Sequence, residues 1–336
     1  MDYMEKQENN KITISVIMPV YNGLGYIEKS LPPLIEMKKR GDVLEIIVVD
    51  DSSSDDTPNV ARNLGAEVIP SGGRLGPGAA RNMAANMAKG NVIWLIDADV
   101  IVHSDAVSYI HDALADPAVV AVFGSYDENP PANNFLSQYK NLVHHFYHHR
   151  GRKEASTFWS GCGAVRKEEF NDAGGFDVEM FKRPSIEDIE LGYRLINRGG
   201  KILLFPEMKS THLKEWRLLN LLHTEIFCRA IPWARLMLES TGIVNDLNVG
   251  RKERFRAIAG CLFFLLLLLP VFNIVPWWTF AVSFLVVVLI NIELFLLFYR
   301  RKGLIFSLMG MLYHQFYYLY STFAFAWCWL EKLLTK

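Results

Sequence analysis

The sequence predicts an α/β domain with a mostly parallel sheet, followed by interfacial helices and about three transmembrane helices. In residues 13–213, runs of aliphatic and β-branched residues alternate with helix-like stretches, an order typical of a parallel sheet covered by helices on both faces. Residues 214–256 are amphipathic and rich in basic side chains, and residues 257–334 carry almost no charge. Residues 1–12 form a polar tail ahead of these three regions.

Composition and the N-terminal sequence exclude several classes of protein. The chain has 336 residues and a formal net charge of −1, whereas bulk nucleic-acid binding requires a basic chain or domain. The first residues lack the apolar core of a signal peptide, so we expect the α/β domain to stay on the side of synthesis. The cysteines show neither a CxxC pair nor a zinc spacing, and we expect buried, reduced thiols. They are Cys162, Cys228, Cys261 and Cys328.

The expected strands end in polar side chains. These strands cover residues 12–20, 44–51, 66–69, 91–97, 119–125, 158–165 and 201–205. The expected helices cover residues 26–39, 79–88, 105–116 and 186–197, with further helices near Pro58 and within residues 130–150. In parallel sheets, ligands collect at the carboxyl ends of the strands. The polar residues at such ends are Asn22, Asp50, Asp51, Asp97 and Asp99.

Asp97-Ala98-Asp99 is the strongest candidate for a metal site. The two carboxylates follow the apolar run at residues 91–96, and the turn after a strand can aim alternate residues at one point. Mg²⁺ or Mn²⁺ prefers such hard oxygen ligands and keeps open positions for substrate phosphates. The alternative is a cluster of helix-capping acids.

Two further stretches suit a nucleotide. Asp50 and Asp51 can accept hydrogen bonds from a base or a ribose hydroxyl, or they can cap the following helix together with the serines at residues 52–54. The glycine-rich loop at residues 72–78 precedes a helix, where backbone N–H groups can meet a phosphate and Arg81 can add a charge-assisted contact. No Gly-Lys-Ser/Thr follows, so this loop is not a P-loop.

The remaining candidates lie in the second half of the α/β domain. Glu187 and Asp188 open a helix, where acids are either capping groups or, in the functional interpretation, a general base for a hydroxyl acceptor. His212 follows the 201–205 strand and is either a further metal ligand or a surface histidine. The histidines at 144, 145, 148 and 149 more plausibly form a solvated or interfacial helix face than a metal site.

The C-terminal third has the pattern of a membrane protein. Residues 214–239 predict an interfacial helix pair broken at Pro232, or else a helix that packs only on the α/β domain. Three apolar segments follow, each long enough to span a hydrocarbon core of roughly 30 Å. They are residues 257–275, 277–299 and 304–330. Basic residues precede the first segment and follow the second, so the first two are expected to form a hairpin with both basic clusters in the cytoplasm, and the third then leads out unless it lies partly in the interface.

Several stretches, taken together and in order, resemble family 2 glycosyltransferases. They are Ser15-Val16-Ile17-Met18-Pro19-Val20-Tyr21-Asn22, Ile47-Val48-Val49-Asp50-Asp51-Ser52-Ser53-Ser54-Asp55, Gly76-Pro77-Gly78-Ala79-Ala80-Arg81-Asn82, Asp97-Ala98-Asp99, Gly174-Gly175-Phe176-Asp177 and Glu187-Asp188. The resemblance covers about residues 12–212. It implies a GT-A fold, a nucleotide-sugar donor (a UDP- or GDP-sugar), a Mg²⁺ or Mn²⁺ cofactor, and inversion at the anomeric carbon.

The resemblance also implies roles for individual residues. Asp188, with Glu187 beside it, would be the catalytic base, and Asp99 would bind the metal, joined by His212. The nucleotide-sugar would be bound by residues at the strand ends and in the glycine-rich loop. These are Pro19, Tyr21, Asn22, Asp50, Asp51, Gly78, Arg81 and Asp97. The acceptor side would be lined by Trp159, Gly161 and Cys162.

The chain departs from the processive synthases that the resemblance also includes. No Gln-x-x-Arg-Trp motif follows the proposed base, and no apolar segment precedes the α/β domain. The resemblance therefore favours a non-processive transferase, with its catalytic domain in the cytoplasm and a multi-pass anchor in the inner (plasma) membrane, acting on a lipid or polyprenyl-phosphate acceptor. The alternatives are a processive polysaccharide synthase and a non-catalytic nucleotide-binding membrane scaffold.

Overall fold

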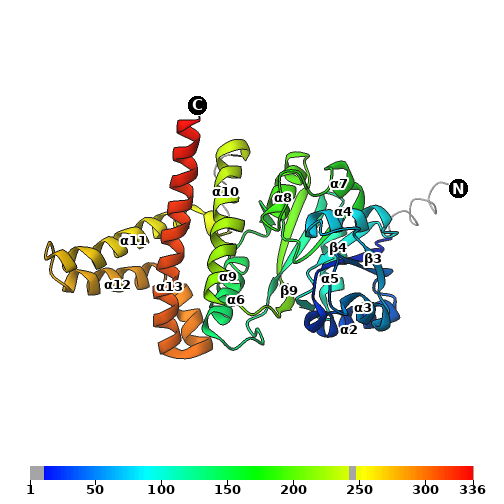
Figure 1. Cartoon of the computed structure of the whole chain (residues 1–336), viewed down its shortest axis with the longest axis horizontal. Coiled ribbons are helices and arrows are strands. Elements are labelled where there is room, and N and C mark those ends of the chain that lie inside the picture. Colours follow the sequence, from blue (N-terminus) through cyan, green and yellow to red (C-terminus); the bar gives the residue numbers. More distant parts are fainter. Residues whose placement is uncertain (1–10, 242–246, 336) are drawn as a thin grey trace. The chain divides into compact units, whose positions relative to one another are not determined.

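The computed structural model describes residues 11–241 and 247–335, and it divides into two compact units (Figure 1). The first unit comprises Met1–Pro131 and Arg152–Lys214, and the second comprises Ala132–Gly151 and Glu215–Lys336. The predicted polar tail, except for its last two residues, lies outside the described residues.

The first unit is built on one mixed sheet in the order β3-β2-β1-β4-β8-β6-β9-β5, with β7 paired to β9. The strands are β1 (Ile14–Val20), β2 (Glu45–Asp50), β3 (Glu67–Pro70), β4 (Val92–Ile96), β5 (Val100–Val102), β6 (Val119–Tyr126), β7 (Glu154–Ala155), β8 (Cys162–Arg166) and β9 (Lys201–His212). β1 to β4 are mutually parallel, β6 and β9 are parallel to each other, and β8 is antiparallel to both β4 and β6. The mostly parallel sheet that the sequence predicts is therefore present.

Helices flank this sheet. They are α2 (Leu24–Arg40), α3 (Thr57–Leu64), α4 (Pro77–Met87), α5 (Ala106–Leu114), α7 (Lys167–Asp172) and α8 (Glu187–Asn197). α2 ends where the sequence predicts, because Gly41 adopts a left-handed conformation (φ 81°) and its N–H bonds the last turn. Every residue of β4 is buried, as is usual for a strand covered on both faces. The rigid end of β4 therefore fixes the place of the acids that follow it.

Three strands of this sheet differ from the expected ones. β5 and the two-residue β7 lie outside the expected strands, and β9 continues from Phe205 to His212. Pro206 interrupts the apolar pattern, and the pairing of β6 with β9 shifts register between Phe123 and Ser125. The predicted end of the strand at residue 205 is thus wrong, and His212 lies within the strand instead of beyond it.

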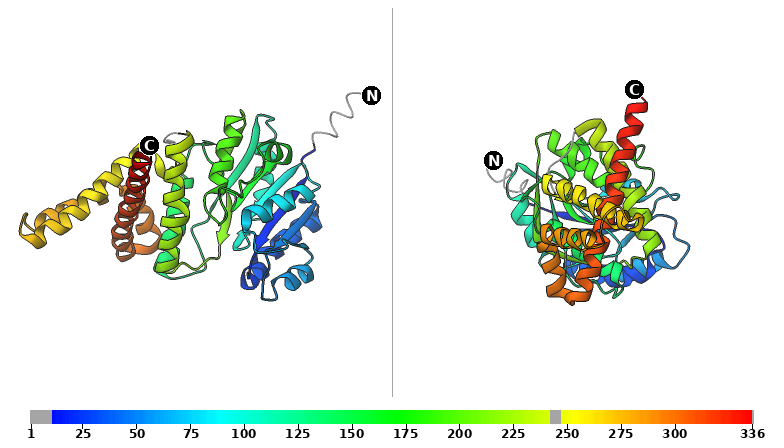
Figure 2. Two further views of the ribbon diagram at one scale, coloured as in Figure 1. Left: turned by 45° about the horizontal axis from the view of Figure 1, so that its top comes forward. Right: turned by 90° about the vertical axis from the view of Figure 1, so that its left-hand side faces the viewer.

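The second unit is helical. Its elements are α6 (Phe135–His148), α9 (Leu218–His223), the π-helix η1 (Thr224–Ala230), α10 (Ile231–Leu236), the π-helix η2 (Met237–Thr241), the short 3₁₀ turn η3 (Leu247–Val249), α11 (Arg251–Leu268), the 3₁₀ turn η4 (Leu269–Phe272), α12 (Trp278–Ile290) and α13 (Ile292–Leu334). Within this unit, α6, α10 and α13 pack side by side, and α11 and α12 form a hairpin that projects away from them (Figures 1 and 2).

The helical region departs from the expected break at Pro232, and its histidine face is only partly exposed. Helical backbone continues from Leu218 to Thr241 through Pro232, because Pro232 lies in the first turn of α10, where its missing N–H is tolerated, and the preceding turn is a π-helix. On α6, His145 and His148 are buried, His144 is half-buried and His149 is exposed, so this histidine face is only partly solvated.

The apolar helices differ in number from the expected three spans. Within the described residues, one helix, Arg251–Phe272, is long and apolar enough to cross a membrane, with a mean hydropathy of 2.3. α12 and α13 would together form a second candidate, but they are bent by 84° at Asn291. α13 is itself interrupted at Gly303 (φ 80°). Three separate spans are therefore not confirmed.

Candidate active site

The two acids that follow β4 lie on a tight turn. The Val100 N–H donates to the Asp97 carbonyl (3.0 Å), so the chain reverses within four residues and enters β5. Ser30 on α2 donates its hydroxyl to the Ala98 carbonyl (2.8 Å), and the Asp97 N–H donates to the Gly161 carbonyl (3.2 Å). Hydrogen bonds to Ser30 and to Gly161 thus hold the backbone that carries both carboxylates.

The turn brings Asp99 to His212. β5 pairs antiparallel with β9, with Val100 opposite His212, and the Leu213 N–H donates to the Asp99 carbonyl (2.8 Å). The imidazole Nε2 lies 3.6 Å from Asp99 Oδ2, and the ring stacks on Tyr126 with centroids 4.4 Å apart. Burial acts to raise the pKa of Asp99, but the hydrogen bond and charge of His212, with Lys214, outweigh it and leave that pKa lowered.

The pair of Asp99 and His212 fits a divalent cation in its chemistry. It offers a carboxylate kept ionised and a buried imidazole, which together suit Mn²⁺ and, less well, Mg²⁺. Within residues 11–241 and 247–335, no three His, Cys, Asp or Glu side chains are grouped so as to hold a metal ion. A metal held here would therefore complete its coordination with water and with substrate oxygens, an arrangement usual for Mg²⁺ and Mn²⁺ at phosphate sites.

Asp97 faces a buried arginine. Arg81, in α4, places Nη2 2.5 Å from Asp97 Oδ1 and Nη1 3.6 Å from Glu187 Oε1, while its Nε is buried without a hydrogen-bond partner. Burial, together with the charges of Asp99 and Asp188, raises the pKa of Asp97 in spite of Arg81. The Asp97 side chain is still 37% exposed, so the guanidinium of Arg81 lies between one partly exposed carboxylate, Asp97, and one buried carboxylate, Glu187.

Glu187 and Asp188 open α8, but they have different surroundings. Asp188 Oδ2 accepts hydrogen bonds from the Ser160 N–H (3.0 Å) and hydroxyl (3.2 Å). Glu187 is buried and accepts from the Ser185 N–H (2.7 Å); burial and the nearby charge of Asp188 raise the pKa of Glu187, opposed by Arg81. Asp188 is thus the oriented, accessible carboxylate of the pair, and the buried Glu187 carboxylate lies beside the Arg81 guanidinium.

This burial predicts that Glu187→Gln stabilises the protein at alkaline pH. Folding raises the pKa of the Glu187 carboxyl, so the folded state favours the protonated side chain. This preference stabilises the folded protein fully at pH values below the pKa of the unfolded state. The stabilisation is lost as the pH rises through the pKa of the folded state. Glutamine keeps the neutral form at every pH. We expect the variant's thermal midpoint to exceed that of the wild type at pH 8, with the difference shrinking towards pH 4. A difference independent of pH would contradict this interpretation.

Asp51 fastens the glycine-rich loop. Its Oδ1 accepts from the Leu75 N–H (2.8 Å) and its Oδ2 from the Gly76 N–H (2.9 Å). Gly76 has φ 87°, a conformation that L side chains rarely adopt, and it lies directly before α4. A Cβ on Gly78 would come within 3.5 Å of Phe176. The predicted nucleotide residue Asp51 thus shapes the loop that leads to Arg81.

The other predicted nucleotide residues gather at the ends of β1 and β2. Asn22 Oδ1 accepts from the Ser54 N–H (2.7 Å), and Asp50 Oδ1 accepts from the Ser53 N–H (3.2 Å). Tyr21, half-exposed beyond Pro19, has the Arg74 guanidinium 4.0 Å above its ring. An aromatic face and a cation therefore mark the open side of this edge.

The predicted acceptor residues divide into two groups. The Trp159 ring meets Tyr126 edge-on with centroids 4.8 Å apart, and a Cβ on Gly161 would come within 2.6 Å of that indole ring. Cys162 is fully buried in the core, where burial raises the pKa of its thiol to about 12. Trp159 and Gly161 therefore remain predictions for the acceptor side, whereas the Cys162 thiol is inaccessible to a substrate.

Four residues at this site have contacts that the sequence alone does not indicate. Ser160 orients Asp188, Tyr126 stacks on His212, and Lys214 adds positive charge near Asp99. Asn82, next to Arg81, accepts from the Phe176 N–H (2.8 Å) and donates to the Phe176 carbonyl (2.8 Å). Ser160 lies between the predicted acceptor residues Trp159 and Gly161, and Asn82 ends the Gly76–Asn82 stretch, so the sequence carries a signal for both. The stacking of Tyr126 depends on strand pairing and has no such signal.

Asn82→Ala is expected to destabilise the first unit by about 2 kcal/mol, because two hydrogen bonds across 94 residues of sequence are lost at about 1 kcal/mol each. Denaturant unfolding followed by Trp fluorescence measures the change. Asn59→Ala is the matched control, since the side chain of Asn59 is exposed and bonds Asp56 and Arg62, three residues away on either side. Equal effects of the two substitutions would show that Asn82 has no special structural role.

Comparisons with known proteins show which proteins this chain is similar to. Residues 15–175 match the model of glycosyl transferase family 2. The chain is 29% identical over 209 residues to the probable glycosyltransferase YdaM of Bacillus subtilis, covering 57% of this chain and 49% of that protein. It is 26% identical over 208 residues to the uncharacterized protein MT1568 of Mycobacterium tuberculosis, covering 56% of this chain and 64% of that protein. The chain thus spans less than two thirds of the length of either relative.

A solved structure extends the likeness to most of the chain. The mannosyltransferase PcManGT from Pyrobaculum calidifontis, solved in complex with GDP-Man and Mn²⁺, superposes with a TM-score of 0.57 at 18% sequence identity, covering 94% of this chain and 88% of that one. At this identity the likeness concerns the fold. The sheet order, the matched residues and this superposition together lead to one assignment: the chain carries a glycosyl transferase family 2 domain over residues 15–175, on an α/β fold of the GT-A type.

Proposed function

We propose that this protein is a membrane-anchored, inverting glycosyltransferase that moves a sugar from a nucleotide-sugar donor to a lipid-linked acceptor at the cytoplasmic face of the inner (plasma) membrane. The observation that carries the proposal is the division of labour among the acids. Asp99 is paired with His212, while Asp188 is oriented separately by Ser160, and the charges of both acids act on Asp97 between them.

Asp99 and His212 are the residues that would hold Mg²⁺ or Mn²⁺. Such an ion neutralises the diphosphate and stabilises the charge that develops on the leaving group. The fit rests on the ionised carboxylate and buried imidazole 3.6 Å apart. The similar fold of PcManGT, solved with GDP-Man and Mn²⁺, supports a donor and a metal of this kind.

The donor would lie along the strand ends, from Tyr21 to the glycine-rich loop. The Tyr21 ring offers a stacking face for a base, and the ends of β1 and β2 offer acceptors for base N–H groups and ribose hydroxyls. Arg81 presents its guanidinium between Asp97 and Glu187, where it balances the carboxylates and limits their repulsion of a diphosphate. A UDP- or a GDP-sugar satisfies this chemistry equally.

Asp188 would be the general base. Its Oδ2 is held by two donors from Ser160, which fixes the orientation of the carboxylate. The carboxylate takes the proton of an acceptor hydroxyl while the hydroxyl oxygen bonds the anomeric carbon. The bond from that carbon to the diphosphate oxygen breaks, and the nucleoside diphosphate leaves with the electron pair. Attack from the face opposite the leaving group inverts the configuration.

The membrane part of the proposal rests on α11 and on the apolar side chains around it. Large apolar side chains are exposed along α11 and its turn, an arrangement rare in soluble proteins but usual in lipid. Four basic residues stand at the start of the helix, as expected at the cytoplasmic boundary. They are Arg251, Lys252, Arg254 and Arg256.

A donor panel tests the proposed function. UDP-, GDP- and dTDP-sugars are incubated with the purified protein and a membrane lipid extract, with Mn²⁺ or Mg²⁺ and again with EDTA, and nucleotide release and lipid products are measured. We expect one donor to give a single glycolipid with inverted anomeric configuration, and no release with EDTA. A product ladder would indicate a processive synthase, and donor binding without turnover in any extract would indicate a scaffold.

A further inference from the structure

In a membrane-anchored chain, two helical segments of the second unit would lie on the same side of the membrane as the catalytic domain. α6 leaves the first unit after Pro131 and the chain returns to that unit at Arg152, so both of its ends are on one side. The helical stretch from α9 to η2 begins shortly after Lys214, carries charges along its length, and is not a membrane-span candidate. Both segments precede the first apolar helix, α11, in the chain. Contacts with them therefore indicate which parts of α13 lie on the catalytic side.

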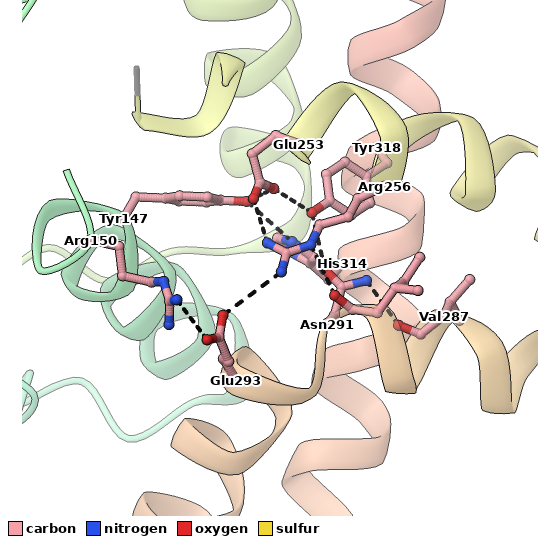
Figure 3. Close-up of polar contacts among 10 residues, drawn as sticks. Tyr147, Arg150, Glu253, Arg256, Val287, Asn291, Glu293, His314 and Tyr318 are labelled. Carbon is pink, nitrogen blue, oxygen red and sulfur yellow. Dashed lines mark hydrogen bonds and ion pairs between the residues drawn. The ribbon is translucent and has the colours of Figure 1, made fainter. Parts of the chain in front are cut away.

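The beginning and the middle of α13 contact the first of these segments, α6. Glu293, near the start of α13, accepts a 2.6 Å ion-pair contact from Arg150, just beyond α6, and Arg256 lies 3.9 Å from the same carboxylate (Figure 3). Further along, His314 Nδ1 is hydrogen bonded to the Tyr139 hydroxyl of α6 (2.7 Å). These contacts hold the first half of α13 beside a helix that does not cross the membrane.

The end of α13 contacts the second segment, the stretch from α9 to η2, at α10 and η2. The Arg235 guanidinium bonds both oxygens of Glu331, with Nη2 at 3.2 and 3.0 Å, and both side chains are half-exposed. Next to it, the Lys332 ammonium donates to the Leu238 carbonyl, and the Cys328 thiol lies 3.7 Å from the Ile231 carbonyl. An ion pair in this position is costly inside a bilayer and inexpensive at its surface.

We infer that α13 lies along the membrane surface, with its apolar face at shallow depth in one lipid leaflet, and that only the α11–α12 hairpin penetrates more deeply into the bilayer. This inference rests on the proposed membrane attachment. Both ends of α13 are bound to helices on the catalytic side, so α13 has no net crossing. The 84° angle between α12 and α13 agrees: if the hairpin stands along the membrane normal, α13 runs close to the membrane plane.

A buried polar cluster fixes this angle at the open end of the hairpin (Figure 3). Glu253, on α11, accepts from the hydroxyls of Tyr147 (2.8 Å) and Tyr318 (2.6 Å) and is paired with Arg256. Arg256 Nε in turn donates to the Ile290 carbonyl (3.0 Å) at the end of α12. One carboxylate thereby joins α6, α11 and α13. Removing one partner of such a buried network leaves the others unsatisfied, which is why the network specifies one arrangement.

The partner of the outer face of α13 is a lipid leaflet. Between residues 304 and 330 this helix carries no charge, and its exposed large side chains recur at helical spacing on one face. They are Leu304, Ile305, Leu308, Met309, Leu312, Phe323, Trp327 and Leu330. The face is continuous in character with the exposed apolar hairpin, and a helix of this length, about 45 Å from residue 305 to 334, exceeds a hydrocarbon core of roughly 30 Å.

Cysteine labelling from each side of the membrane tests the inference. In a full-length background with Cys228 and Cys261 changed to Ser, one cysteine is introduced at Thr335 or, as a second position, at Leu334, which is 86% exposed. A membrane-impermeant maleimide is applied to spheroplasts and to inverted vesicles. Glu36→Cys on α2 marks the catalytic side. We expect the C-terminal positions to label like Glu36→Cys, in inverted vesicles only; labelling in spheroplasts would overturn the inference.

The depth of spin labels in the lipid is an independent test, which also shows what covers the exposed face of α13. Nitroxide labels are placed on the exposed face of α13 at Ile305, Leu312 and Phe323, with matched labels at Ile258 and Leu265 on α11 and at Phe272 in η4, in vesicles of neutral and anionic phospholipid. We expect similar, shallow depths along α13 and increasing depth along α11. Increasing depth along α13 to a maximum at its middle would mean a spanning helix. Spin–spin broadening without lipid contact would mean that a second copy covers the face.

The two tests separate this inference from the proposed function. If the protein is released from membranes by alkaline carbonate and none of the labels contacts lipid, the membrane attachment itself is wrong, and the inference falls with it. If the protein stays in the membrane, transfers sugar to lipid and labels at Thr335→Cys from outside, only the inference about α13 is wrong.

Discussion

Asp188→Asn is expected to lower kcat by roughly 10²–10⁴-fold, with little change in the KM of the nucleotide-sugar, because the variant keeps the shape of the side chain and loses the proton acceptor. Asparagine can still accept one of the hydrogen bonds from Ser160, so the local fold should persist. Steady-state kinetics with saturating lipid acceptor measures the effect. A matched substitution, Ser160→Ala, removes one hydroxyl donor and should cause a much smaller loss.

The size of the Asp188→Asn effect also reports on the acceptor. A hydroxyl must lose its proton during attack, whereas a phosphate acceptor is already ionised and needs little base catalysis. We expect the full loss with a hydroxyl acceptor and a loss below about tenfold with a polyprenyl phosphate, as judged from the magnitude of general-base effects. An unchanged rate with a hydroxyl acceptor would contradict the assignment of Asp188 as the base.

Asp99→Ala is expected to abolish the response to Mn²⁺ and to reduce turnover by roughly 10²–10⁴-fold, because stabilisation of a leaving diphosphate by a metal contributes several kcal/mol. His212→Ala should act in the same direction, and the double variant should lose little more than Asp99→Ala alone, since residues that act as a unit are not additive. Titration with Mn²⁺ at fixed donor concentration measures the apparent metal affinity of each variant.

The chain offers a matched control for this pair. His103 and Asp127 also form a histidine–carboxylate contact, with Nε2 3.3 Å from Oδ2, in the same unit. Thr211 bonds both side chains, so this contact is satisfied internally. We expect His103→Ala to leave the metal dependence of turnover unchanged. Equal loss of metal response in His103→Ala and His212→Ala would show that the effect comes from disturbed folding.

The sequence predicted the position of the acids because that position follows from chain order alone. β4 is a continuous apolar strand, and the next residues, Asp97 and Asp99, had to emerge at its carboxyl end. The different surroundings of Asp97 and Asp99 could not be predicted, because they depend on residues distant in the sequence. Arg81 forms an ion pair with Asp97, and the pairing of β5 with β9 brings His212 to Asp99.

The extension of β9 shows the limit of local patterns. After Pro206 the strand alternates buried Met208, Ser210 and His212 with more exposed neighbours, but two of these buried residues are polar. Burial therefore alternates from one residue to the next along this part of the strand, but apolar and polar residues do not. Strand prediction from sequence relies on the second kind of alternation. Tertiary contacts stabilise the strand here, including the close approach of Gly124 to Met208.

The helical unit was predictable in composition but not in arrangement. The apolar segments were visible in the sequence, whereas the assignment of α6 to the second unit depends on Glu253, Glu293 and His314, which lie more than 100 residues away from it. The bend at Asn291 interrupts a run that hydropathy alone treats as one segment. Hydropathy measures the preference for lipid, and the direction of a helix in the membrane is set by packing and by polar anchors.

Nucleotide release from the preferred donor, followed in the wild type, Asp99→Ala and Asp188→Asn with lipid acceptor and a Mn²⁺ titration, is the most direct test of the proposed division of labour. We predict metal-dependent release in the wild type, a weak and metal-insensitive rate in Asp99→Ala, and in Asp188→Asn a low rate that still responds to Mn²⁺. Wild-type rates and wild-type metal response in both variants would contradict the account.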